Sequence, residues 1–172
     1  SWDGSMQVVH LEEVPLQRLR ERYIELRAKY RVRVSVIDSL PYTDVVLALQ
    51  SIDQNLWASV YTNMRGPELF TVKKREEKDE EGLQQLRQIN VARDKTFDAL
   101  MAFIRSGQFS KVTDQNDDLF VTHCTDMRRM KDWDARAQEM VFRWVKSEQG
   151  DDHYWFATSY AFLAKHICSI FS

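Results

Sequence analysis

Residues 31–41 read Arg31-Val32-Arg33-Val34-Ser35-Val36-Ile37-Asp38-Ser39-Leu40-Pro41, and they predict a short β-strand that ends on an acid. Within this stretch β-branched residues alternate with polar ones, a pattern typical of a packed strand. Pro41 has no backbone N–H to donate to a neighbouring strand, so the strand should end before it. Ligands of open α/β sheets bind beyond the carboxyl ends of the strands. Asp38 is therefore a candidate metal ligand, although an aspartate here could instead cap the turn that follows.

The segments on either side predict an alternation of strands and helices. A strand is expected over 6–14, after an Asp-Gly hairpin turn, and a helix over 15–30. The apolar stripe of this helix consists of Leu16, Leu19, Tyr23, Leu26 and Tyr30. A helix capped by Thr43 should run to residue 52, and residues 56–61 should form the next strand. This order favours parallel pairing through helical crossovers and hence an α/β fold.

The second half of the chain opens with a charged segment. Residues 63–88 mix basic and acidic side chains, which predicts an inserted loop or hairpin rather than a domain boundary. The elements expected after it are helices over 91–107 and 114–124, strands over 128–134 and 139–146, and a last helix that starts near Asp152. Gly107 should end the first of these helices.

Composition and missing motifs narrow the class of protein. The 172 residues, of which 44% are hydrophobic, predict a single ordered domain over 1–172. A net charge of −2 gives no overall basic surface, so a nucleic acid would be held by local patches or through metal ions. No apolar run has the length of a membrane span, so no membrane partner is expected. Cys124 and Cys168 lack CxxC spacing and are expected to be reduced core thiols of a cytosolic protein. The absence of GxxxxGK[ST], GxGxxG and HExxH patterns disfavours an ATPase, a dinucleotide enzyme and a zinc protease.

Three stretches, taken in their order, resemble the C-terminal nuclease domain of the large terminase of tailed phages. The first is the strand that ends in Ile-Asp-Ser-Leu-Pro, over 30–41. The second is Ile-Asn-Val-Ala-Arg-Asp-Lys-Thr-Phe-Asp-Ala-Leu, over 89–100. The third is Gly-Asp-Asp-His-Tyr-Trp-Phe-Ala-Thr-Ser-Tyr-Ala, over 150–161. The resemblance implies a ribonuclease H-like α/β fold, a mixed sheet flanked by helices, which here lacks its first strands.

The same resemblance implies a function and a site. The family's nuclease cuts concatemeric double-stranded phage DNA during packaging and uses two Mg²⁺ or Mn²⁺ ions held by acids. By the match, Asp38 and Asp152 are catalytic metal ligands, Asp151 is an alternative ligand, and His153 orients or contacts the water. The family's first-strand acid has no counterpart in this chain, and Phe156 stands where related sequences often carry a second His. The implied partners are the portal and the small terminase subunit, in the cytoplasm of the infected bacterial host.

The chemistry agrees with these residue types. Two divalent ions roughly 3.5–4 Å apart can stabilise both the attacking and the leaving oxygen of a phosphodiester, and hard cations prefer carboxylate oxygens to thiolates. Asp152 has a structural alternative, because an aspartate before a helix can cap its free N–H groups.

Contacts to DNA should go mainly to the backbone. The candidates are Lys73, Lys74, Arg75, Arg128, Arg129 and Lys131, each of which could instead be a solvated surface residue. Trp133 and Trp155 are expected in the core rather than as platforms for bases.

Two rival interpretations stay open. The first keeps the fold and the metal chemistry in a transposase or integrase core or a Holliday-junction resolvase. The second is a non-catalytic ribonuclease H-like module that binds DNA or protein, and the missing first-strand acid favours it.

Overall fold

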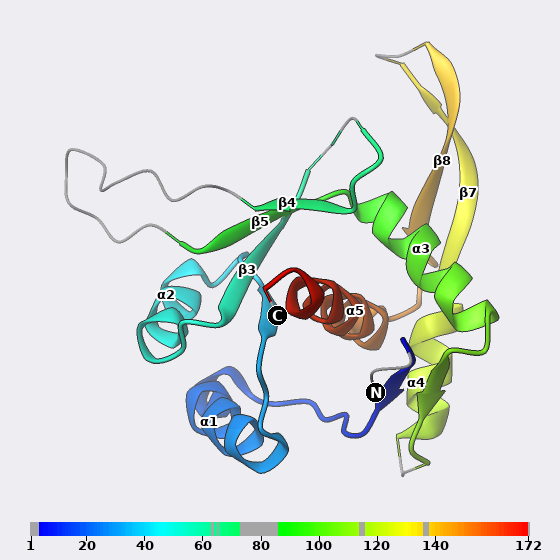
Figure 1. Cartoon of the computed structure of the whole chain (residues 1–172). Helices are drawn as coiled ribbons and strands as arrows, with labels where there is room; N and C mark the ends of the chain where they lie inside the picture. Colours follow the sequence, from blue (N-terminus) through cyan, green and yellow to red (C-terminus); the bar gives the residue numbers. More distant parts are fainter. Residues whose placement is uncertain are drawn as a thin grey trace, which may run out of the picture. The chain divides into compact units, whose positions relative to one another are not determined.

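The chain folds into helices and open sheets of a mixed α/β class (Figure 1). The computed structural model describes residues 4–62, 64, 66–72, 86–113, 116–135 and 138–171. It divides into two compact units. We call Glu13–Arg93 with Tyr160–Ser172 the sheet unit, and Ser1–Glu12 with Asp94–Ser159 the hairpin unit. The single domain over 1–172 stays a prediction.

The sheet unit is built on four strands in the order β2-β3-β5-β4. Strands β2 (Ser35–Asp38), β3 (Leu56–Tyr61) and β5 (Gln88–Val91) are parallel, and β4 (Phe70–Val72) pairs antiparallel with β5 at the edge. Helix α2 (Thr43–Ile52) connects β2 to β3. This β2–α2–β3 crossover confirms the parallel pairing that the sequence predicts, because parallel neighbours need such a connection.

Strand β2 ends on Asp38, as predicted, but it begins at Ser35 rather than at residue 31. The residues before it finish the preceding helix, α1 (Leu19–Tyr30). Arg31 adopts a left-handed conformation with φ 51°, and the Val32 N–H donates to the Arg27 carbonyl at 3.0 Å. A left-handed residue after the last turn is a common way to end a helix. Because the residues at the start of the valine alternation are used in this helix end, the strand begins only at Ser35.

The last helix packs on this sheet. Leu163 and Ile167, on α5 (His153–Phe171), are fully buried in one cluster with Ile89 and Val91 of β5. Partly buried side chains surround the cluster: Val34, Val36, Trp57, Tyr61, Phe70 and Tyr160. Although α5 is the longest helix described, none of the helices in the described ranges has both the length and the apolar character to cross a bilayer.

Helix α1 departs from the apolar stripe predicted for it. The short 3-10 turn η1 (Leu16–Arg18) precedes it, and none of its own residues is fully buried. Leu16 is 39% exposed and Tyr30 is 37% exposed, so the expectation of a buried stripe is wrong at both ends.

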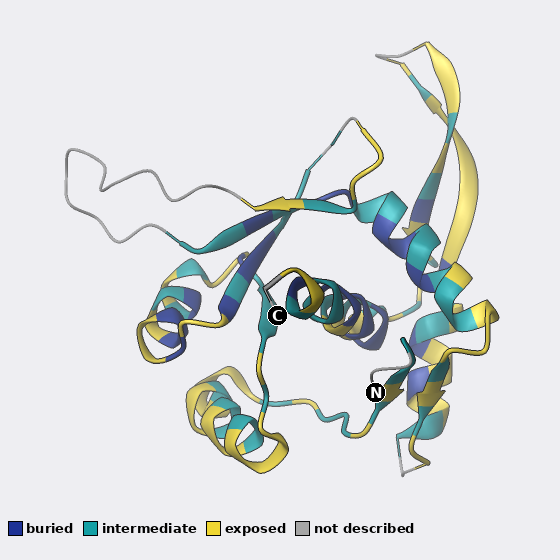
Figure 2. Ribbon diagram, in the orientation of Figure 1, coloured by how far each residue is buried: buried dark blue, intermediate teal, exposed yellow. Residues whose placement is uncertain are grey.

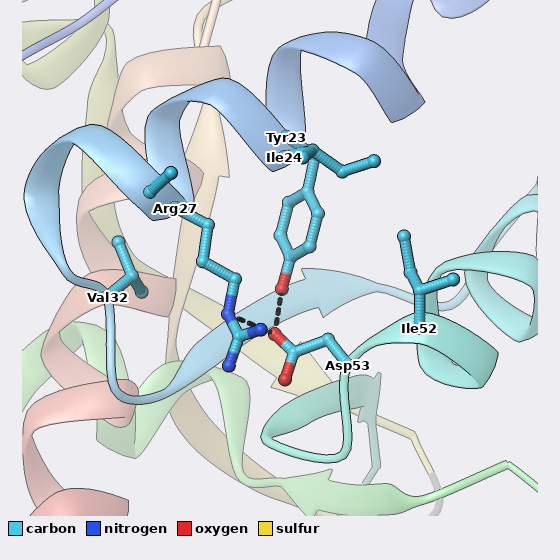
Figure 3. A pocket seen from close by; sticks show the side chains of 7 residues that line it. Tyr23, Ile24, Arg27, Val32, Ile52 and Asp53 are labelled. Carbon is cyan, nitrogen blue, oxygen red and sulfur yellow. Dashed lines mark hydrogen bonds and ion pairs between the residues drawn. The ribbon is translucent and has the colours of Figure 1, made fainter.

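A polar network holds α1 instead (Figure 3). The Tyr23 hydroxyl donates a hydrogen bond to Asp53 Oδ2, and Arg27 Nε lies 2.9 Å from the same oxygen. Asp53, just after α2, is only 2% exposed, and its Oδ1 accepts the Asn55 N–H at 2.8 Å. Because both oxygens have partners, the cost of burying the charge is offset. The network fixes α1 to the connection between α2 and β3.

The described part of the hairpin unit contains a two-stranded parallel sheet, two helices, a long hairpin and the start of α5. Its elements are β1 (Met6–Val8), β6 (Phe109–Lys111), α3 (Arg93–Arg105, whose first residue belongs to the sheet unit), α4 (Asp117–Thr125), β7 (Met127–Asp134) and β8 (Glu139–Lys146). The expected hairpin of β7 and β8 is confirmed. Strand β1 is shorter than the predicted 6–14 and pairs with β6. Asp3 of the proposed Asp-Gly turn lies outside the described residues, and Gly107 ends α3 with φ 77°, as predicted.

Aromatic rings fill the core of the hairpin unit. The Phe97 ring meets Trp144 and Trp155 edge-on, with centroids 6.2 and 5.5 Å away. Asp98 Oδ1 accepts the Trp144 indole N–H at 2.9 Å. Trp155 is therefore a core residue, as expected. Trp133, near the tip of the hairpin, is 55% exposed, so its predicted core position is wrong. Cys124 and Cys168 are half-buried rather than core thiols.

Replacing Asp53 tests the network that holds α1. We expect Asp53→Asn to lower the free energy of unfolding by about 2–3 kcal/mol, because Arg27 loses its counter-charge while an amide N–H₂ group is buried. Urea unfolding measures this change. Asp44→Asn removes an exposed acid in the first turn of α2 and should cost less than about 1 kcal/mol. Equal losses in the two variants would contradict a structural role of Asp53.

The alkaline stability of the chain tests the Tyr23 contact. Burial, together with the hydrogen bond to Asp53, raises the pKa of Tyr23 to about 12 from an ordinary value of 10. The folded state then holds a proton that the unfolded chain releases, so stability should fall as the pH rises from 10 to 12. Tyr23→Phe should make this decline shallower in pH-dependent urea unfolding. Tyr42→Phe, at an exposed tyrosine, is the control, and the same slope in both variants would refute the coupling.

Candidate functional site

Asp38 lies half-buried at the carboxyl end of β2, beside Ser59 of the parallel strand β3. Its Oδ1 accepts the Leu40 backbone N–H at 3.1 Å, so the turn-capping role that the sequence left open is present. Its Oδ2 accepts a hydrogen bond from the Tyr160 hydroxyl at 2.8 Å. A carboxylate oxygen has more than one acceptor site, so these two bonds leave capacity for a cation.

Tyr160 is the contact that sequence reasoning missed. Its spacing along α5 matches that of the apolar residues Leu163 and Ile167, yet its hydroxyl reaches Asp38, and its ring stacks on Tyr61 with centroids 6.1 Å apart. Burial raises the pKa of the Tyr160 phenol well above its usual value, and repulsion from Tyr61 and Asp38 acts in the same direction. The phenol therefore stays protonated and donates to Asp38. The only sequence signal was a polar group in an otherwise apolar helix stripe.

A buried hydroxyl group lies on the strand next to Asp38. Ser59 Oγ, at the Asp38 register position of β3, lacks a hydrogen-bond partner among the described residues. The Asp38 carboxylate and this hydroxyl are hard oxygen donors, the kind that Mg²⁺ and Mn²⁺ prefer. The residues at this end of the strands thus fit a divalent cation by donor type.

The number of acids at this edge is small. Across the described residues, no group of three or more His, Cys, Asp or Glu side chains is placed to hold a metal ion. Mg²⁺ sites in enzymes acting on phosphates commonly use one or two carboxylates, completed by waters and substrate oxygens. Asp38 alone would therefore supply part of such a coordination shell.

The start of α5 carries the other predicted acids. The Asp152 carbonyl accepts the Phe156 N–H at 3.0 Å, so Asp152 occupies the residue position that precedes the first turn. The Asp151 N–H donates to Asp126 Oδ2 at 3.2 Å, while the Asp151 side chain lies 3.8 Å from His153 Nε2 and is exposed. These residues belong to the hairpin unit and Asp38 to the sheet unit. Their pairing with Asp38 stays a prediction.

The predicted DNA contacts fall into two groups. Lys73, Lys74 and Arg75 lie outside the described residues. Arg128, Arg129 and Lys131 are exposed on β7. Arg129 is held in place, because its Nε and Nη2 lie 2.7 and 2.8 Å from the two carboxylate oxygens of Asp98.

A cavity of about 450 Å³ lies elsewhere in the sheet unit, against α1 (Figure 3). It is lined by Tyr23, Ile24, Arg27, Ala28, Val32, Ile52 and Asp53. Its charged groups already pair with one another, and it contains none of the predicted site residues. No local pattern of the sequence signals the Arg27–Asp53 ion pair, because the two residues come from different elements.

Gly150 tests how the turn before α5 is built. A Cβ at this position would lie 2.3 Å from Ser147 Oγ and 2.5 Å from Asp126 Oδ2. Gly150→Ala should displace Asp126 and weaken its bond to the Asp151 N–H, at a cost of about 1–3 kcal/mol in thermal unfolding. Gln149→Ala, at the exposed neighbouring position, is the matched control. If both variants melt at the same temperature, the close approach does not constrain the turn.

Similarity to known proteins gives no role for this site. Comparisons with protein-family models, curated proteins and solved structures find no match to this chain. The resemblance to the terminase nuclease therefore rests on the three quoted stretches, and the ribonuclease H-like topology is a proposal beyond the mixed α/β class.

Proposed function

We propose that this chain is a metal-dependent endonuclease that hydrolyses phosphodiester bonds of double-stranded DNA, with Asp38 as a ligand of its metal ions. The proposal includes the ribonuclease H-like fold. It draws its support from the carboxyl edge of the parallel strands, where Asp38 lies.

The observation that carries the proposal is the hydrogen bond from Tyr160 to Asp38 Oδ2. Residue 38 belongs to the first of the three stretches that resemble the terminase nuclease, and residue 160 belongs to the third. These residues are 122 positions apart, yet their side chains are in direct contact. If the first and third stretches resembled the terminase nuclease by chance, their residues would have no reason to be in contact. If the two stretches form one site, their side chains have to lie close together.

The chain's own residues have definable tasks in this reaction. Bound divalent ions would stabilise the attacking and leaving oxygens of the phosphodiester. Asp38 would hold an ion through its unshared lone pairs, and Tyr160 would fix the direction of the carboxylate, as hydrogen-bonding partners of metal ligands generally do. Asp152, with Asp151 as its alternative, would supply a second carboxylate, and His153 would orient or contact the water.

The family likeness extends the proposal to substrate and partners. The DNA would be a phage concatemer, cut during packaging in the infected bacterial host, and the partners would be the portal and the small terminase subunit. Exposed Arg128 and Lys131 would contact the DNA backbone.

Plasmid nicking with Mn²⁺ or Mg²⁺ tests the proposal. We expect Asp38→Asn to reduce the nicking rate by about 100-fold or more, because it replaces a charged ligand with a neutral amide of equal size. Tyr160→Phe should reduce it by about tenfold and raise the Mn²⁺ concentration needed for half-maximal rate, as expected for loss of a partner of the ligand. Asp44→Asn, which changes an exposed acid of α2, should nick like the unchanged chain.

Three other outcomes would change the assignment. Equal nicking by Asp38→Asn and Asp44→Asn would remove Asp38 from the site. No nicking by any of them, together with no Mn²⁺ binding in calorimetry, would favour the non-catalytic module. Cleavage only at the junctions of branched DNA substrates, located by mapping the fragment ends, would favour a junction resolvase.

A further inference from the structure

The β7–β8 hairpin has two faces of different chemistry. Side chains alternate along a strand, and directly paired residues share a face. By the observed register, the Trp133 face consists of Met127, Arg129, Lys131, Trp133, Met140, Phe142, Trp144 and Lys146. The opposite face consists of Arg128, Met130, Asp132, Asp134, Glu139, Val141, Arg143 and Val145.

Charge is divided unequally between these faces. The eight described residues of the Trp133 face include three cations and no acid, whereas the opposite face has three acids and two cations. On the opposite face, Arg143 Nη2 lies 2.8 Å from Asp134 Oδ2, so cation and acid are paired there. Asp98, from α3, offsets one charge of the Trp133 face by binding Arg129. Lys131 and Lys146 leave this face with an excess of positive charge.

Aromatic side chains are exposed on the outer half of the Trp133 face, and Figure 2 colours most of β7 as exposed. Met127 and Trp144, at the base of the hairpin, are buried. Towards the tip, Trp133 is 55% exposed and Phe142 is 52% exposed. Large aromatic side chains left in water at neighbouring positions of one face typically mark a binding surface.

Aromatic rings between cations suit single-stranded nucleic acid. Every base has a π-face that can stack on an aromatic ring, and a cationic surface attracts the backbone. In a duplex the bases are already stacked on each other and out of reach. The Arg129 guanidinium lies 4.5 Å from the Phe142 ring centroid, so a cation and a platform are already combined. A symmetric contact with a second copy would instead bring the same excess of positive charge together from both sides.

We propose that the Trp133 face of the β7–β8 hairpin binds single-stranded nucleic acid, with bases stacked on Trp133 and Phe142 and the backbone on Lys131. This activity goes beyond the proposed nuclease function and does not require that the chain cuts DNA.

Fluorescence anisotropy of a labelled oligothymidylate, in EDTA and at low salt, tests the proposal. We expect Trp133→Ala and Phe142→Ala each to weaken binding roughly tenfold, the usual effect of removing one stacking platform, and Trp133→Phe to retain most of it. Met130→Ala is the matched control, since Met130 is 53% exposed on the opposite face of the same hairpin. Lys131→Gln should lower the slope of log affinity against log salt by about 0.7.

Two results would overturn the proposal. One is oligothymidylate affinity that falls no further in Trp133→Ala than in Met130→Ala, with both variants folded by circular dichroism. The other is a change of sedimentation coefficient in Trp133→Ala without a change of oligothymidylate affinity, because the face would then be an interface between copies. Asp38→Asn should bind oligothymidylate normally, so failure of the nuclease proposal and failure of this one are seen separately.

Discussion

The hydrogen bond between the Tyr160 hydroxyl and the Asp38 carboxylate depends on how the last helix packs on the sheet. Leu163 and Ile167 bury one side of α5 against Ile89 and Val91 of β5. Apolar burial sets the position of this helix without specifying polar contacts, because it is not directional. Tyr160 adds the direction, since a phenol can pack its ring with Tyr61 and still present a donor at its far end. The end of β2 is therefore held by a residue from the far end of the chain.

Two acids of the sheet unit show how different environments give a carboxylate different tasks. Asp53 is buried, and its Oδ2 alone interacts with both Tyr23 and Arg27. A charge that is neutralised and enclosed in this way contributes to position rather than to chemistry. Asp38 is half-buried, and its partners, a backbone N–H and a phenol, are neutral. Its negative charge is not neutralised by these bonds, which is the condition a cation-binding carboxylate has to meet.

Local patterns of the sequence predict where helices and strands occur better than they predict which of these elements pair or pack together. The helix Thr43–Ile52, the strand Leu56–Tyr61 and the β7–β8 hairpin follow from periodicity and turns, which act over a few residues. The strand that pairs with β1 and the residues that pack against α1 are distant in the sequence. An apolar stripe predicts that one side of a helix is buried, but it does not identify the element that buries it. Asp38 could be proposed because a strand end is a local signal. Its contact with Tyr160 could not be derived, because it requires the relative placement of β2 and α5.

The different burial of two tryptophans on the β7–β8 hairpin could not be predicted from the sequence. Trp133 and Trp144 lie on one face of β7–β8, yet Trp144 is buried at the base and Trp133 is exposed near the tip. Composition treats the two tryptophans alike, and only the length of the hairpin beyond its packed base separates them. A two-stranded hairpin has little stability of its own, so its base needs the contacts of Trp144 with Asp98 and Phe97. The exposed rings at the tip gain no such burial. Packing within the hairpin unit therefore accounts for the burial of Trp144 but not for the exposure of Trp133. The proposed binding of single-stranded nucleic acid would account for the latter.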